Sequence, residues 1–285
     1  MRVHLLTCGH TTARAWLARR GAGFAEVRFP ALVAVIEHER GVVVVDTGYA
    51  PRVVEAMRHG LDRLYGLALP VTVGPGEPLV DQLGTLGIAP GDVRTVVLTH
   101  LHADHLGGLV DLPDARVVTD ARALAVARAR RGLARARTGF VPALVPPSTD
   151  VVDVTSLPVV DEPRLATLGL GALGPTLSEP GPVRDLTGDG SVLVVPLPGH
   201  HDGHLGVLVR GGARDLLLVG DAVWDRRTVD DLRLPSRLVA MATHDWPRYV
   251  ATVQALHRLT VADPDLLVVP SHDEQAISDA RAVLG

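Results

Sequence analysis

The sequence contains no lysine, only one cysteine, few aromatic residues and no long apolar run. With Cys8 alone among 285 residues, the chain can form neither an internal disulfide nor a metal site built from several cysteines. Its apolar stretches, such as residues 41–45, fall far short of the roughly 18–20 residues of a membrane-spanning helix. The N-terminal stretch is too poor in apolar residues for a signal peptide. We therefore expect a cytoplasmic protein with no membrane partner.

The charge balance argues against a nucleic-acid partner. All 28 basic residues are arginines, and 32 acidic residues leave a formal net charge of −4. Binding to a phosphate backbone requires a basic surface, and aromatic residues, at 3% of the chain, leave few side chains on which bases could stack. We expect a small-molecule substrate instead.

What the sequence does contain is histidine. Thirteen histidines accompany the single cysteine, so any bound metal must be held by imidazole and carboxylate groups. With 47% hydrophobic and 21% charged residues, the composition is that of a folded protein.

Periodicity and turn residues predict alternating strands and helices along most of the chain. We expect strands at 2–6, 31–38, 41–45, 93–98, 115–119, 191–196, 205–210, 215–219 and 265–269, and helices at 51–59, 79–86, 120–131, 246–259 and 273–284. Asp245 is the predicted N-cap of the helix at 246–259. Two β-rich halves with helices outside predict an α+β fold, a four-layer αββα sandwich in a single domain over residues 1–285.

A proline- and glycine-rich stretch at about 132–190 interrupts this pattern. We interpret it as an insertion or cap with short strands inside the one domain. Its apolar residues are candidates for the wall of an acyl-chain pocket or for a homodimer contact, two alternatives that stay open: Phe140, Val141, Leu144 and Val145.

The most informative segment follows the predicted strand at 93–98. It places His100, His102, Asp104 and His105 in a loop between that strand and a predicted helix. Alternation along an extended backbone aims the first two imidazoles to one side, and the next two groups lie where the chain turns. Burying four such groups is costly without a shared partner, and a divalent metal is the obvious one.

With its companions, this segment resembles the signature of the metallo-β-lactamase superfamily. The superfamily's landmarks occur in the expected order and span most of the chain: Asp46-Thr47-Gly48, His100-x-His102-x-Asp104-His105, Pro198-Gly199-His200, Gly220-Asp221 and Ser271-His272.

The resemblance implies two divalent metal ions, Zn²⁺ first, with iron, manganese or cobalt as alternatives. One ion would be bound by His100, His102 and His200, the other by Asp104, His105 and His272, with Asp221 bridging the two. A metal-bound hydroxide would attack the substrate, and Asp104 would accept and return its proton. Asp46 would orient a ligand, as metal-bound histidines require.

Within the superfamily, the sequence is most similar to N-acyl-homoserine lactonases, above all at Ser271-His272-Asp273-Glu274-Gln275. Lactone ring opening is therefore the first expectation for the reaction. Lactonases of this type carry a tyrosine three residues after the bridging aspartate, where this chain has Trp224. The alternative is a glyoxalase-II-like thioesterase, acting on a thioester of coenzyme A or of a carrier protein.

Two further residues stand close to the expected ligands. His204, four residues after His200, is expected to support the site by hydrogen bonding rather than to bind metal. Trp224 is either a substrate-pocket residue or part of the core.

Overall fold

The computed structural model describes residues 1–161, 182–240 and 243–284. The chain forms two compact units. The first comprises Met1–Ala13 and Arg28–Asp153, and the second comprises Arg14–Val27 and Val154–Gly285. Among the described residues, no helix is long and apolar enough to cross a membrane.

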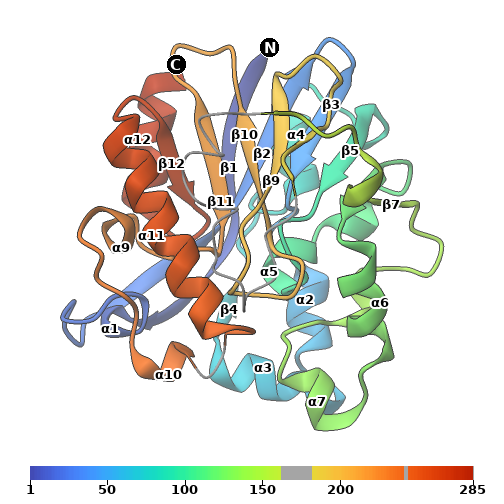
Figure 1. Cartoon of the computed structure of the whole chain (residues 1–285). Helices are drawn as coiled ribbons and strands as arrows, with labels where there is room; N and C mark the ends of the chain where they lie inside the picture. Colours follow the sequence, from blue (N-terminus) through green and yellow to red (C-terminus); the bar gives the residue numbers. More distant parts are fainter. Residues whose placement is uncertain (162–181, 241–242, 285) are drawn as a thin grey trace. The chain divides into compact units, whose positions relative to one another are not determined.

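The first unit contains a seven-stranded sheet in the order β4-β1-β2-β3-β5-β6-β7 (Figure 1). Its strands are β1 (Arg2–Arg14), β2 (Glu26–His38), β3 (Gly41–Val45), β4 (Val71–Thr72), β5 (Val93–Val97), β6 (Arg116–Thr119) and β7 (Val151–Asp153). From β3 to β7 every pairing is parallel. Four of the five residues of β5 are buried, as an almost continuous apolar run predicts.

Helices cover this sheet and share one core with it. They are α2 (Pro51–Ala56), η1 (Gly60–Asp62), α3 (Arg63–Ala68), α4 (Leu79–Thr85), η2 (Pro90–Asp92), α5 (Ala103–Leu106), η3 (Leu109–Asp111), α6 (Ala121–Ala129), α7 (Gly132–Ala136) and η4 (Pro142–Leu144). Val53 of α2, Leu83 of α4 and Leu124 of α6 pack in the same cluster as Val44 and Val96 of the central strands. Each such side chain contributes roughly 1.5–3 kcal/mol by leaving water.

The second unit contains a five-stranded sheet in the order β12-β11-β10-β9-β8. Its elements are α1 (Ala15–Ala18), η5 (Val154–Ser156), β8 (Arg184–Asp185), β9 (Val192–Pro196), β10 (Leu205–Val209), β11 (Leu216–Gly220), α9 (Arg227–Asp230), α10 (Arg237–Ala240), α11 (Trp246–Ala262), β12 (Leu267–Pro270) and α12 (Glu274–Leu284). In Figure 1, α12 lies along β12. Val253 and Leu256 of α11 share a core with Leu193 of β9 and Val219 of β11.

Most predicted elements are present with their ends shifted by a few residues. Asp245 accepts a hydrogen bond from the backbone amide of Arg248 at 3.0 Å and so caps α11 as predicted. The strand predicted at 2–6 is in fact β1, which continues to Arg14. The sequence did not predict α1, α3, α9 or α10, which are short and lack periodicity.

The proline- and glycine-rich stretch contributes edge strands to both sheets. Within it, β7 pairs with β6 and β8 pairs with β9, while residues 162–181 lie outside the described part of the chain. The expectation for its apolar residues is wrong. They are packed in the core of the first unit, so they form neither a pocket wall nor a dimer contact: Phe140, Val141, Leu144 and Val145.

Candidate metal centre

The histidine-rich segment of the first unit lies where β5 ends and α5 begins. His100 lies three residues beyond β5, and His102 directly precedes Ala103, the first residue of α5. Asp104 and His105 belong to the first turn of that helix. His100 and His105 are each only 1% exposed and Asp104 is 5% exposed, so three groups that can carry charge are withdrawn from water.

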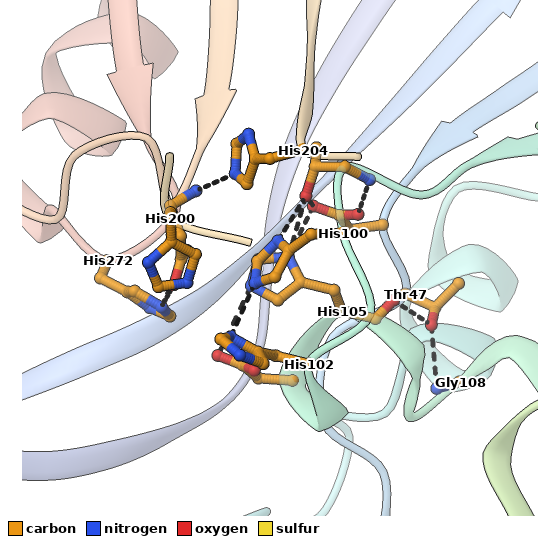
Figure 2. Close-up of polar contacts among 12 residues, drawn as sticks. Thr47, His100, His102, His105, Gly108, His200, His204 and His272 are labelled. Atoms are coloured by element: carbon orange, nitrogen blue, oxygen red, sulfur yellow. Dashed lines mark hydrogen bonds and ion pairs between the residues drawn. The ribbon is translucent and has the colours of Figure 1, made fainter. Parts of the chain in front are cut away.

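The side chains of this segment form two close pairs of donor atoms. Nε2 of His100 and Nδ1 of His102 are 2.9 Å apart, and Nε2 of His105 lies 3.6 Å from Oδ2 of Asp104 (Figure 2). The rings of His100 and His105 have centroids 4.0 Å apart. Two ligands of one tetrahedral ion, each about 2.0–2.1 Å from it, are about 3.4 Å apart. The spacings are thus those of donor atoms that share an ion.

Asp46 fixes the orientation of His105. Its Oδ2 accepts a hydrogen bond from Nδ1 of His105 at 2.7 Å, and both groups are buried. An imidazole that donates through Nδ1–H carries its lone pair on Nε2, the atom next to Asp104. Asp46 therefore selects the tautomer that a metal ligand needs.

Thr99 does the same for His100, and the sequence did not reveal it. Its hydroxyl donates to Oδ2 of Asp46 at 2.8 Å, and its amide donates to Oδ1 at 2.8 Å. The hydroxyl oxygen of Thr99 lies 3.1 Å from Nδ1 of His100, where it can accept the ring proton. One carboxylate thus orients two imidazoles, His105 directly and His100 through the threonine.

Close backbone packing holds the Asp46 turn against the histidine segment. The hydroxyl of Thr47 donates to the carbonyl oxygen of His105 at 2.9 Å and accepts from the amide of Gly108 at 3.2 Å (Figure 2). A Cβ at Gly108 would lie 2.7 Å from the carbonyl oxygen of Thr47, and one at Gly107 would lie 2.8 Å from the amide nitrogen of Ala50. Larger residues at these two positions would push the turn away.

The second unit contains three further candidate ligands, each beyond the end of a strand. His200 follows β9, Asp221 directly follows β11 and His272 lies two residues beyond β12. They are 4%, 2% and 8% exposed. Nε2 of His200 is 3.5 Å from Oδ2 of Asp221, and Nε2 of His272 is 3.1 Å from the same oxygen. These are again spacings of donor atoms that share an ion.

Helix α11 holds the loop that carries His200. The amides of His244 and Asp245 donate to the carbonyl oxygens of His200 and Gly199, each at 2.9 Å. Gly199 has φ +129° and packs against the backbone of Tyr249, which leaves no room for a Cβ. Burial, together with the charge of Asp221, raises the pKa of Tyr249, which therefore stays a neutral phenol.

His204 supports Asp221 from the neighbouring strand. Its Nε2 accepts a hydrogen bond from the backbone amide of Asp221 at 3.2 Å (Figure 2). The side chain, only 2% exposed, thereby fixes the point at which the chain leaves β11. This geometry is that of a supporting residue.

Trp224 also contacts Asp221. Its indole Nε1–H donates to Oδ2 of the carboxylate at 2.9 Å, and its ring lies edge-on to those of His200 and His272. The sequence suggested a pocket or a core residue. Neither interpretation predicted the hydrogen bond to Asp221, because the sequence does not show where an indole N–H points.

The residues of both units suit a divalent metal. Imidazole and carboxylate groups are the donors that zinc, iron, manganese and cobalt accept. The buried donor atoms stand at ligand spacings, and the imidazoles of His105 and His100 are orientated through their second nitrogen. The chemistry and spacing of these donor atoms are therefore those that a divalent ion would accept.

The chain matches known proteins along most of its length. A model described as the metallo-beta-lactamase superfamily matches residues 27–272. A probable metallo-hydrolase of Mycobacterium tuberculosis is 32% identical over 269 residues, which cover 87% of this chain and 76% of that protein. An N-acyl homoserine lactonase, AttM, of Azorhizobium caulinodans is 28% identical over 278 residues, with 97% and 94% covered.

A solved structure shares the fold. It is a mutant of AiiA from B. thuringiensis with N-decanoyl-L-homoserine bound at its active site. The TM-score is 0.72 at 14% sequence identity, and the match covers 98% of this chain and 95% of that one.

Proposed function

We propose a reaction for this chain from one premise: the chain belongs to the metallo-β-lactamase superfamily, whose model matches residues 27–272. It is a metallo-hydrolase with the fold of that superfamily, as its sequence predicted. What it hydrolyses is our proposal. We infer that it opens the ring of a lactone, a small cyclic ester.

We propose that the residues of the superfamily's motifs bind two divalent ions. Seven residues would hold them: His100, His102, Asp104, His105, His200, Asp221 and His272. The donor chemistry favours Zn²⁺, since histidine-rich sites with carboxylates suit it, while iron, manganese and cobalt accept the same ligands.

When bound, the ions would lower the pKa of a water molecule and polarise the substrate carbonyl. The side chains then have two tasks. Asp104 accepts the proton of the attacking water as that oxygen bonds to the carbonyl carbon. As the ring C–O bond breaks, Asp104 returns the proton to the leaving oxygen, and the product is a hydroxy acid. Asp221 would keep the ligand side chains around it in place.

One observation carries the choice of a lactone. The match to AttM, a lactonase, extends over 97% of this chain and 94% of that protein, so it is not confined to the motifs. Similarity along nearly the whole chain supports a similar substrate class.

A second candidate is supported by Trp224. Lactonases of this type have a tyrosine at this position, whereas here the indole N–H donates to Asp221. An indole cannot accept a proton or relay one. A thioester of coenzyme A or of a carrier protein, whose thiolate leaves without a proton, would tolerate this change better than an ester would.

A substrate panel tests the assignment. The metal-loaded enzyme is assayed with N-acyl-homoserine lactones, simple lactones, aryl esters and acyl-coenzyme A thioesters. We expect the highest kcat/KM for a lactone. Turnover of thioesters with no lactone hydrolysis would reject the first proposal in favour of the second.

Location and assembly belong to the proposal as well. We propose that the enzyme acts in the cytoplasm on a small molecule, without nucleic acid or membrane as partner, and that it can form a homodimer. The acidic charge balance supports the absence of a nucleic-acid partner. Light scattering of the purified protein measures its oligomeric state directly.

A further inference from the structure

Trp224 contacts every ligand residue of the second unit. Its Nε1–H donates to Oδ2 of Asp221 at 2.9 Å. Its ring centroid lies 5.8 Å from that of His200 at an interplanar angle of 74°, and 6.5 Å from that of His272 at 73°. Edge-on contacts of this kind are favourable between aromatic rings. One side chain therefore limits the movement of three others.

The loop around Trp224 is itself anchored. Asp225 pairs with Arg19 of the segment after β1 at 3.0 Å, and with Arg227 at 3.0 Å. The amide of Arg226 donates to Oδ2 of Asp273 at 2.7 Å, and Asp273 directly follows the ligand His272. Because its neighbours in sequence are fixed, the indole is held in its orientation before any ion binds.

We propose that Trp224 is a positioning residue for the metal centre, which holds the carboxylate of Asp221 for metal binding rather than contacting substrate. An ionised carboxylate oxygen has more than one lone pair, so Oδ2 can accept the indole N–H and still bind a metal. The hydrogen bond restricts rotation of the carboxylate, which would lower the conformational entropy lost when Asp221 binds a metal ion.

The indole N–H of Trp224 is not available to a substrate, because the carboxylate of Asp221 already accepts it. A donor already engaged by Asp221 is not offered to the carbonyl oxygen of a substrate. Position 224 therefore takes part in arranging the ligands, and groups that orient the substrate must come from elsewhere. This inference rests on the proposed metal binding, but it is independent of whether the substrate is a lactone or a thioester.

Metal affinity tests the proposal without any substrate. The metal-free Trp224→Phe variant is titrated with Zn²⁺ in competition with a chromophoric chelator, and Co²⁺ loading is followed by its visible absorption. Loss of a partner that orients a ligand typically weakens metal binding about 10–100-fold. We expect a loss of this size and an altered Co²⁺ spectrum. Trp246→Phe is the matched control, since Trp246 is also half-buried but stacks on Tyr249, with centroids 5.2 Å apart.

A second variant separates the hydrogen bond from packing. Replacing Trp224 by β-(3-benzothienyl)alanine puts sulfur in place of the N–H and preserves the shape of the ring. We expect this protein to keep its thermal stability and still to lose metal affinity about 10-fold or more. Wild-type affinity and an unchanged Co²⁺ spectrum in the benzothienyl protein would overturn the proposal. Failure of the substrate panel alone would reject the proposed reaction and leave this inference standing.

Discussion

Two imidazoles of the first unit depend on a single carboxylate. Asp46 accepts from Nδ1 of His105 at 2.7 Å and from the hydroxyl of Thr99 at 2.8 Å, and that hydroxyl faces Nδ1 of His100 at 3.1 Å. The sequence predicted Asp46, because it belongs to a motif. It could not predict Thr99, because a threonine after a strand is common and its role depends on where the hydroxyl points.

Thr99→Val tests this relay at the residue scale. Valine keeps the shape of the side chain but removes the oxygen between Asp46 and His100, so the imidazole loses the group that selects its tautomer. We expect Zn²⁺ affinity to fall roughly 10–100-fold. The free energy of unfolding should fall by about 1–3 kcal/mol, because Asp46 loses a buried donor. Chelator competition and urea denaturation measure the two effects.

The control for this variant is Thr260→Val in α11. The hydroxyl of Thr260 donates to the backbone carbonyl of His257 at 2.9 Å, within the helix. We expect unchanged metal affinity in this variant. If Thr99→Val bound Zn²⁺ as tightly as the control does, Thr99 would have no part in orienting His100.

At the scale of elements, the candidate ligands lie at or beyond the ends of strands. Close contacts between backbone segments hold the turns that carry them. Alternation and apolar runs located most strands, because β3, β5 and β9 to β12 have strong patterns. The segment Arg14–Val27 escaped prediction, since it contains only one helical turn, α1, and polar or glycine-rich sequence. Its link to the Asp225 loop, through Arg19, is visible only in the fold.

A glycine pair tests the packing beside the histidine segment. A Cβ at Gly107 would lie 2.8 Å from both the amide nitrogen of Ala50 and Cγ2 of Val53, whereas Gly84 in α4 has open space around it. Gly107→Ala should destabilise the protein by about 1–3 kcal/mol through overpacking. Gly84→Ala should be stabilising by about 0.5–1 kcal/mol, because alanine favours the helix. Equal unfolding free energies for the two variants in urea would contradict this account of the turn.

The ion pair at Asp225 predicts acid sensitivity. Burial opposes ionisation of this carboxyl, yet hydrogen bonds from Arg227 and Arg19 prevail and lower its pKa. A carboxyl with a lowered pKa stabilises the fold above its unfolded pKa of about 3.9, and that stabilisation is lost as the pH falls towards the folded pKa. Unfolding free energy should therefore decrease steeply below about pH 4.

Asp225→Asn should weaken this dependence. We expect the variant to be less stable at neutral pH by roughly 1–3 kcal/mol and to lose less stability on acidification. Both proteins are measured free of metal, so that acid release of ions does not contribute. Asp265→Asn is the control, since that side chain is 95% exposed and 3.9 Å from Arg214. If the unfolding free energy of Asp225→Asn equalled that of the wild type at every pH, the ion pairs of Asp225 would have no stabilising role.

At the scale of the whole molecule, the family could be predicted from the sequence and the substrate could not. The family was predicted from motifs spread along the chain in a fixed order: 46–48, 100–105, 198–200, 220–221 and 271–272. The match of the superfamily model to residues 27–272 confirms that prediction. Substrate choice depends on side chains in loops, whose contacts no periodic pattern predicts. The cap at about 132–190 illustrates this, because four of its apolar residues proved to be core.

The central claim is that the seven proposed histidine and aspartate ligands bind divalent metal. Metal content of purified His102→Ala and Asp221→Ala tests it most directly, because each variant removes a proposed ligand from a different unit. We predict about two ions per chain in the wild type, with less metal and little hydrolysis in both variants. Full metal content together with full activity in either variant would contradict the account.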